Sequence, residues 1–179
     1  KIIFTAHGWA YNEDRSFFQK FSISILDFIT VAFSHLTIAV SEKAKEQFKS
    51  AGLMKQKMIV IHNGIGAIEF IEREKARQEF EKSRFPQTEE VKEMIKSEPL
   101  WAGTISELHK NKGLIYAIEA IAALRKSMVN VIFIIMGEGE ERKNLEEIIR
   151  KNNLENSILL VGNVENASSY LKALDIFTL

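Results

Sequence analysis

The chain has 179 residues, which is enough for one large domain or two small ones. Its 24 basic side chains balance 24 acidic ones, so no net field favours nucleic acid or an anionic membrane as a partner. The absence of cysteine excludes disulfides and thiolate metal sites, and it fits a reducing compartment, so we expect a cytoplasmic protein.

Short apolar runs alternate with helical patterns along almost the whole chain, which is typical of βα units that wind a parallel sheet. We predict strands near residues 2–5, 36–40, 58–62, 99–103, 129–136, 157–161 and 175–178. We predict helices near residues 15–34, 42–50, 72–84, 88–96, 113–126, 139–151 and 166–173. The pattern predicts an α/β fold. Because it starts and stops at strands, we expect an internal fragment of a longer protein.

The longest apolar stretch, residues 17 to 40, carries an apolar side chain at every fourth position of its first part. These residues are Phe17, Phe21, Ile25, Ile29 and Phe33. Lys20 and Asp27 interrupt the stretch, so we predict a helix packed on a sheet rather than a membrane span.

Charge density divides the chain. Sixteen of the thirty residues from 69 to 98 are charged, so this segment is expected to supply little core. We therefore predict the C-terminal part of one Rossmann-like domain over 1–66, a charged helical connection over 67–96, and the N-terminal part of a second Rossmann-like domain over 97–179. A ligand site is expected where the two domains meet.

The loop from Gly103 to Gly113 is the most informative segment. It lies between a predicted strand and a predicted helix, and it carries Lys110 and Lys112. A helix N-terminus with unpaired N–H groups and nearby ammonium groups suits a phosphate, at the strand end where parallel sheets bind ligands. The alternative is a βα loop with solvated lysines, and these residues alone do not decide between the two.

Histidine and glycine also follow other predicted strands. His7 and Gly8 follow the first strand, where glycine lets a ligand approach the backbone; the alternative is a histidine satisfied within its loop. His62, Asn63 and Gly64 follow the third strand, and the Asn-Gly pair favours a turn that acts as a hinge over a ligand role.

The segment Gly137-Glu-Gly-Glu-Glu-Arg142 follows a strand and opens a helix, which suggests dinucleotide binding. That interpretation fails because Arg142 occupies the place of the third glycine and three glutamates would repel a pyrophosphate. Glu138 is able to accept hydrogen bonds from sugar or ribose hydroxyls, or it only compensates a helix dipole. Asn163 and Val164 follow the next strand, where backbone groups are able to bind a flat base edge.

Metal ligands are scattered in this chain. It has three aspartates, at positions 14, 27 and 175, and no Asp-x-Asp pair that would hold a divalent ion against a diphosphate. We therefore expect a metal-independent site with no cofactor.

Together, these motifs resemble the GT-B glycosyltransferases of family four, over nearly the whole chain. The matching segments are Thr5 to Trp9, Thr37 to Glu42, Val60 to Ile65, Glu72 to Phe80, Gly103 with Lys112 and Gly113, Gly137 to Gly139, and Val161 to Val164. The resemblance implies two facing Rossmann-like domains, both incomplete here. It also implies a retaining transfer of sugar from a nucleoside diphosphate sugar to a hydroxyl of a sugar, lipid or polysaccharide, with membrane association left open.

By the same resemblance, His7 and Lys112 are catalytic, and Lys112 stabilises the leaving diphosphate. The residues implied in nucleotide-sugar binding are Gly8, Gly103, Thr104, Lys110, Gly137, Glu138, Gly139, Asn163 and Val164. Thr104 stands where many relatives have arginine, so diphosphate binding is expected to depend on Lys110 as well. The family's paired glutamates would follow Leu179, so the fragment alone is expected to be weakly active or inactive. A sugar-nucleotide 2-epimerase and a non-catalytic nucleotide-binding module remain alternatives.

Overall fold

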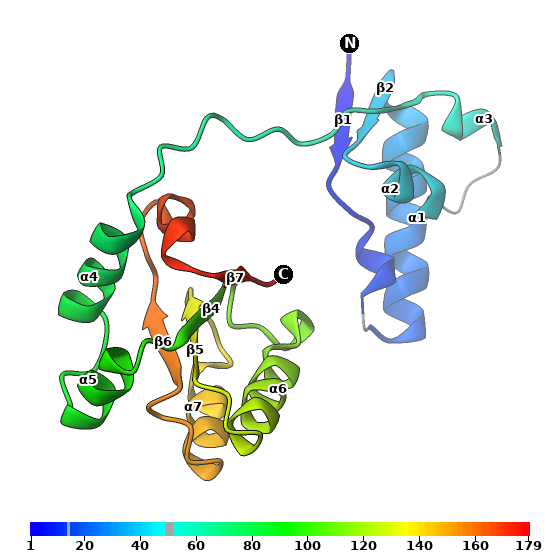
Figure 1. The fold of residues 1–179 in the computed structure, drawn as a ribbon. Coiled ribbons are helices and arrows are strands. Elements are labelled where there is room, and N and C mark those ends of the chain that lie inside the picture. Colours follow the sequence, from blue (N-terminus) through cyan, green and yellow to red (C-terminus); the bar gives the residue numbers. More distant parts are fainter. Residues whose placement is uncertain (14, 49–51) are drawn as a thin grey trace. The chain divides into compact units, whose positions relative to one another are not determined.

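The computed structural model describes residues 1–13, 15–48 and 52–179. The chain forms two compact units, Lys1–Gly66 and Ala67–Leu179. Each unit contains one parallel β-sheet with helices beside it (Figure 1). The expected α/β class and its two sheets are confirmed.

The first unit has a three-stranded sheet of order β1-β2-β3, formed by β1 (Ile3–Ala6), β2 (Leu36–Ala39) and β3 (Met58–Val60). Its helices are η1 (Ala10–Asn12), α1 (Phe17–Phe33), α2 (Glu42–Gln47) and α3 (Gly52–Lys55). The short elements η1 and α3 were not predicted, because three or four residues are too few to show a helical period.

Trp9 organises the core of the first unit. Its indole N–H donates to the carbonyl of Ala44 over 2.5 Å, and its ring lies 4.7 Å from the ring of Phe48 between centroids. The Tyr11 hydroxyl donates to the carbonyl of Gln47 over 2.9 Å. These contacts join the segment after β1 to α2 and so fix the end of the first strand.

The prediction that α1 packs on the sheet through its apolar stripe is wrong. Its five residues, Phe17 to Phe33 at every fourth position, are between 44% and 77% exposed, whereas Val31 is fully buried. Val31 lies two positions from Ile29 and Phe33, which is about 200° around a helix. The period identified a helix correctly but not the side that packs, because α1 is apolar on most of its circumference. In the described part of the chain, no helix has the length and apolarity needed to cross a bilayer.

The second unit has a four-stranded parallel sheet of order β6-β5-β4-β7. Its strands are β4 (Leu100–Ile105), β5 (Val131–Met136), β6 (Ile158–Gly162) and β7 (Ile176–Phe177). Its helices are α4 (Arg73–Ser83), α5 (Glu89–Lys96), η2 (Lys110–Lys112), α6 (Leu114–Lys126), α7 (Arg142–Lys151) and η3 (Ala167–Ala173).

All six residues of β5 are buried, because helices cover both faces of this sheet (Figure 1). Ile132 and Ile134 pack in a cluster with residues of α4, α5 and η3. Phe133 and Ile135 pack in a second cluster with residues of α6 and α7. The continuous apolar run 129–136 is therefore a central strand, as parallel sheets require.

The expectation that residues 67–96 form a surface connection outside the core is wrong. Ala76 and Phe80 of α4 and Val91 of α5 are at most 1% exposed, and the Phe85 ring lies 5.4 Å from that of Trp101. Both helices belong to the second unit. A helix needs only a narrow apolar stripe to pack, so a high share of charged residues on its other sides does not exclude it from a core.

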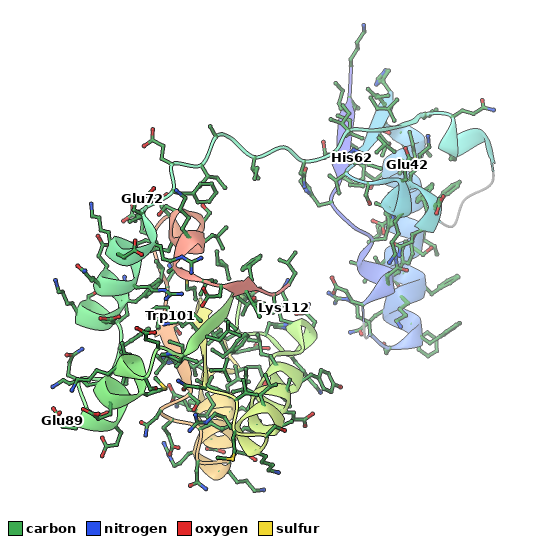
Figure 2. The ribbon with its side chains drawn as sticks, in the orientation of Figure 1. Glu42, His62, Glu72, Glu89, Trp101 and Lys112 are labelled. Atoms are coloured by element: carbon green, nitrogen blue, oxygen red, sulfur yellow. The ribbon has the colours of Figure 1, made fainter. Side chains whose placement is uncertain are left out.

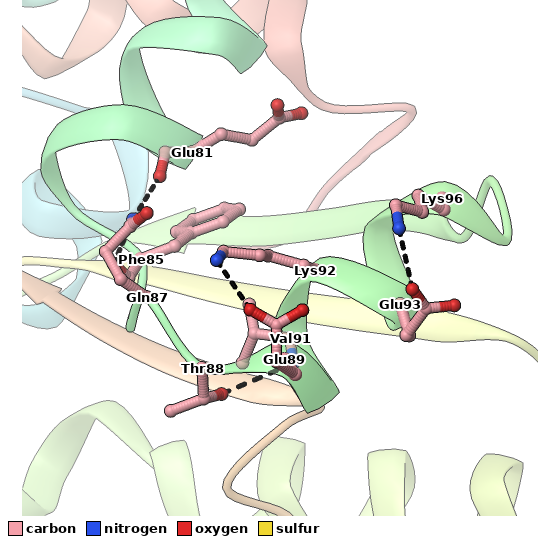
Figure 3. Close-up of polar contacts among 9 residues, drawn as sticks. All are labelled: Glu81, Phe85, Gln87, Thr88, Glu89, Val91, Lys92, Glu93 and Lys96. Carbon is pink, nitrogen blue, oxygen red and sulfur yellow. Dashed lines mark hydrogen bonds and ion pairs between the residues drawn. The ribbon is translucent and has the colours of Figure 1, made fainter.

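The turn between α4 and α5 is held by side chains (Figure 3). The Gln87 amide donates to the carbonyls of Glu81 and Phe85 over 2.6 and 3.0 Å. Thr88 caps α5 by accepting from the N–H of Val91 over 3.4 Å. These contacts bring Phe85 and Val91 onto the sheet.

Asp175 joins α4 to the sheet. Its Oδ1 lies 2.5 Å from Nη1 of Arg73, and its Oδ2 lies 2.9 Å from Nη2 of Arg77 and accepts from the Trp101 N–H over 2.8 Å. Arg77 also donates to the carbonyl of Ala173 and lies over the Trp101 ring at 4.7 Å. Partial burial raises the pKa of Asp175, but the Trp101 hydrogen bond and the two arginines outweigh it, so the pKa lies below its ordinary value.

The segment between the two units has no helix or strand from Ile61 to Glu72. The predicted Asn63-Gly64 turn is wrong, because neither residue is assigned to a turn and Gly64 does not have a positive φ. The Asn-Gly signal indicates only which backbone angles are permitted, and the chain here does not use them.

Two loops of the second unit are interlocked. The N–H of Leu108 donates to the carbonyl of Glu138, and the N–H of Glu141 donates to the carbonyl of Leu108, over 2.9 and 3.0 Å. A Cβ at Gly137 would lie 2.0 Å from the carbonyl oxygen of Ser106, and one at Gly139 would lie 2.4 Å from that of Leu108. Glycine is therefore required at both positions for the loop after β5 to pass the loop after β4.

We expect Asp175→Asn to destabilise the second unit by about 1–2 kcal/mol at pH 7, because it removes the carboxylate that pairs with both Arg73 and Arg77. Since the pKa of Asp175 is lower in the folded than in the unfolded state, its contribution is present above about pH 4, the unfolded value, and is lost as the pH falls through the folded value. Hydrogen exchange of residues 100–105 measures the effect. Glu89→Gln, which removes an exposed ion pair with Lys92, is the control and should change nothing. An equal effect of both variants would contradict the role of Asp175.

We expect Gly137→Ala to destabilise the second unit by about 2 kcal/mol or more, because the new Cβ meets the Ser106 carbonyl and the residue has a φ of +149°. Gly8→Ala is the matched control, since a Cβ there has no atom within 4 Å. Urea unfolding of both variants measures the difference. Wild-type stability in Gly137→Ala would show that the two loops do not need their close approach.

Candidate functional site

The four strands of the second sheet run parallel, so their carboxyl ends lie at one edge. The loops that leave this edge carry most of the residues predicted to bind a donor. Gly103 and Thr104 lie within β4, and Lys110 and Lys112 lie in the loop after it. This is the edge where open α/β sheets bind their ligands.

A groove of about 730 Å³ runs along this sheet beside α6. Most of its lining is apolar, from β4, β5, β7 and α6. At the carboxyl edge the lining becomes polar, with Thr104, Ser106, Lys112 and Thr178. Thr178 is held there by its N–H, which donates to the Gly103 carbonyl over 2.9 Å. A polar end on an apolar groove suits a ligand with one charged and one apolar or flat part.

Lys112 lies at the end of η2, next to the first turn of α6 (Figure 2). The intervening Gly113 has a left-handed backbone with φ of +65°, which turns the chain into α6. No side chain caps α6. The N–H of Tyr116 donates to the Gly113 carbonyl over 2.9 Å, which leaves the N–H groups of Leu114 and Ile115 for an anion. Lys110 and Lys112 are exposed, and neither forms an ion pair within the described residues. Both ammonium groups are therefore available to a ligand.

His109 adds a second connection between the loops, which the sequence did not reveal. Its Nδ1 accepts from the N–H of Asn111 over 3.2 Å and so caps η2. Its Nε2 lies 3.3 Å from Oε1 of Glu140 in the loop after β5. The spacing of His109 and Glu140 in sequence, 31 positions, contains no local signal for this contact.

Gly103, Gly137 and Gly139 lack side chains for a reason other than ligand approach. A Cβ at Gly103 would lie 2.7 Å from the carbonyl oxygen of Ile134 and 3.0 Å from Leu174. At all three positions, the space for a side chain is filled by protein atoms. Contact between the backbone of these glycines and a donor remains a prediction.

Glu138 belongs to the loop after β5, and its side chain lies beside the end of β6. Its Oε1 accepts from Nη1 of Arg142 over 2.7 Å, and it would be 3.0 Å from a Cβ at Gly162. Asn163 is exposed, whereas Val164 is 8% exposed with its side chain in the core. The Val164 side chain is therefore not open to a ligand.

In the first unit, His7 and Gly8 are exposed directly after β1, and His62 follows β3 at the same edge of the first sheet. Ser41 is structural, because its hydroxyl caps α2 by accepting from the N–H of Ala44 over 3.0 Å. Within the described ranges, no three His, Asp or Glu side chains gather in a way that would hold a metal ion.

The family model for glycosyl transferases group 1 matches residues 86–179, and that for glycosyltransferase family 4 matches residues 1–67. A protein of Methanocaldococcus jannaschii named as an uncharacterized glycosyltransferase is 33% identical over 73 residues, which cover 41% of this chain and 18% of that protein. The GtfA subunit of a UDP-N-acetylglucosamine–peptide N-acetylglucosaminyltransferase of Streptococcus agalactiae is 38% identical over 74 residues, which cover 41% of this chain and 14% of that protein.

Among solved structures, HepE of Anabaena with UDP and glucose superposes with a TM-score of 0.68 at 19% identity, over 98% of this chain and 45% of HepE. WaaG, a glycosyltransferase involved in lipopolysaccharide biosynthesis, has a TM-score of 0.69 at 17% identity, over 98% of this chain and 49% of WaaG. These likenesses establish the GT-B fold expected from the sequence. The chain spans less than half the length of each relative.

The group 1 model alone covers more than half of the 179 residues. The chain therefore belongs to the group 1 glycosyl transferase family.

Proposed function

We propose that the protein containing this chain transfers a sugar from a uridine diphosphate sugar to a hydroxyl group of a carbohydrate or lipid acceptor. Family membership supports the reaction class. The choice of uridine rests on relatives whose names or bound ligands include UDP. In this reaction the bond from the sugar C1 to the diphosphate breaks, C1 bonds the acceptor oxygen, and the acceptor proton is released.

The observation that carries this proposal is the polar end of the groove beside Lys112. Breaking the C1–O bond places the negative charge of the leaving group on the diphosphate. An ammonium group and open N–H groups at a helix N-terminus are suited to stabilise that charge. Lys112 and the first turn of α6 supply both.

Lys110 is a second ammonium group on the same short helix, where it offsets the lack of an arginine at Thr104. Thr104 is 5% exposed, so its side chain is packed in β4 and has little surface to offer a phosphate.

The role of His7 remains a prediction from the family resemblance. His7 is an exposed side chain at a strand end and is free to bind a hydroxyl group. The cytoplasmic localisation expected from the lack of cysteine also remains a proposal.

We expect Lys112→Ala in the full-length protein to lower kcat/KM for the UDP-sugar by about 10²–10³-fold and to weaken UDP binding, because a group that stabilises the leaving charge is lost. Lys110→Ala should have a smaller effect. Steady-state kinetics and calorimetric UDP titration measure both quantities.

The matched control is Lys126→Ala, at the opposite end of α6, which should leave both quantities unchanged. If Lys112→Ala behaves like Lys126→Ala, the diphosphate does not bind at this loop and the proposed site is wrong.

A further inference from the structure

Arg142 is fixed at three points. Its Nη1 donates to Oε1 of Glu138 over 2.7 Å, its Nη2 donates to the carbonyl of Leu160 in β6 over 3.1 Å, and its Nε lies 2.9 Å from Oε1 of Glu146. A guanidinium group has a rigid planar fork of donors, so two hydrogen bonds and an ion pair in different directions fix its orientation. Arg142 thus connects the loop after β5 to the edge strand β6.

The Glu138 carboxylate is held over the end of β6 by this connection. A Cβ at Gly162 would lie 3.0 Å from Oε1 of Glu138, so the carboxylate occupies space that a side chain there would take. The N–H of Gly137 donates to the carbonyl of Gly162 over 2.8 Å, which joins the same two segments through the backbone. Both the side chain and the main chain therefore fix where this carboxylate lies.

Glu138 still has hydrogen-bonding capacity for a ligand. Its side chain is 49% exposed, and a carboxylate has about four lone-pair sites, of which the contact with Arg142 uses one. Arg142 also compensates the negative charge of Glu138, which would otherwise repel the diphosphate of a donor bound at the neighbouring loop.

The distance between the ends of β4 and β6 fits a nucleoside diphosphate sugar that contacts both. Neighbouring strands lie about 4.8 Å apart, so the end of β6 lies about 10 Å from the end of β4 across β5. A nucleoside diphosphate sugar bound by its phosphates near Lys112 reaches that far with either its ribose or its hexose. Both carry hydroxyl groups that donate hydrogen bonds to a carboxylate.

We propose that Arg142 is a positioning residue that holds the Glu138 carboxylate over the end of β6, where it accepts hydrogen bonds from hydroxyl groups of the nucleotide-sugar donor. This role rests on the proposed function. Arg142 acts through Glu138 and does not itself contact the donor. Arg142, which stands where a dinucleotide fingerprint has its third glycine, therefore supports donor binding through Glu138.

The test compares the wild-type full-length protein with Arg142→Gln, Glu138→Gln and the double variant, with calorimetric titration of UDP, 2′-deoxy-UDP, UDP-glucose and UDP-N-acetylglucosamine. If ribose is the partner, the wild type binds UDP about 10-fold or more tightly than 2′-deoxy-UDP, and each single variant loses most of that preference. If the hexose is the partner, the variants keep the ribose preference, and the better UDP-sugar loses about 10-fold in affinity relative to UDP. Either outcome supports the proposal.

The double variant should lose no more than either single variant, because both substitutions remove one interaction. Glu147→Gln, an exposed acidic residue of α7 without an ion pair in the described chain, should keep all four affinities. A general loss of structure would lower the affinity for every ligand alike and would not change these ratios.

If Arg142→Gln binds the nucleotides with the same affinity ratios as the wild type, this inference alone is overturned. It is also overturned if Arg142→Gln changes these ratios and Glu138→Gln does not. If the wild-type protein binds none of the four ligands, the proposed uridine diphosphate donor is wrong and the inference is overturned with it.

Discussion

The close approach of two backbone segments controls the whole carboxyl edge of the second sheet. Leu108 exchanges hydrogen bonds with the loop after β5, and Gly137 and Gly139 leave room for this contact. These contacts join the loop that carries Lys112 to the loop that carries Glu138 at Leu108. The spacing between the proposed phosphate and hydroxyl contacts is therefore set by main-chain packing, which is more rigid than any surface side chain.

Charge is separated along this edge in a way that matches a nucleotide sugar. Lys110 and Lys112 lie after β4 without acidic partners in the described chain, whereas Glu138 lies toward β6 with Arg142 as its partner. An uncompensated carboxylate near a diphosphate would weaken its binding, and an uncompensated arginine would compete with Lys112 for the phosphates. Pairing Arg142 with Glu138 and Glu146 reduces both effects and leaves a cluster with a single negative charge, in which Glu138 still accepts hydrogen bonds from hydroxyls.

The sequence predicted every strand and the long helices because their signals are local. Buried strands such as residues 131–136 appear as continuous apolar runs, and the segments between them have a helical period. The errors concern what each element packs against, which is not local. The phenylalanines of α1 are exposed while Val31 is buried, and the charged helix α4 places Phe80 in the core. A period identifies a helix, but the partner that covers it is determined by residues far away in sequence.

The same limit applies to the candidate site, because the sequence indicated its loops but not the contacts that support them. The family resemblance implied that Gly103, Gly137 and Gly139 bind the donor; the structure shows protein atoms in the space that a side chain at these positions would take. In the sequence, Arg142 only excludes a dinucleotide site, because it occupies the place of the third glycine. That glycine permits close helix–strand packing. Here the side chain at that position binds the carbonyl of Leu160 and the carboxylate of Glu138 instead. Arg142, the first residue of α7, thus holds this helix to β6 by a hydrogen bond and holds the Glu138 carboxylate in the space that a side chain at Gly162 would take.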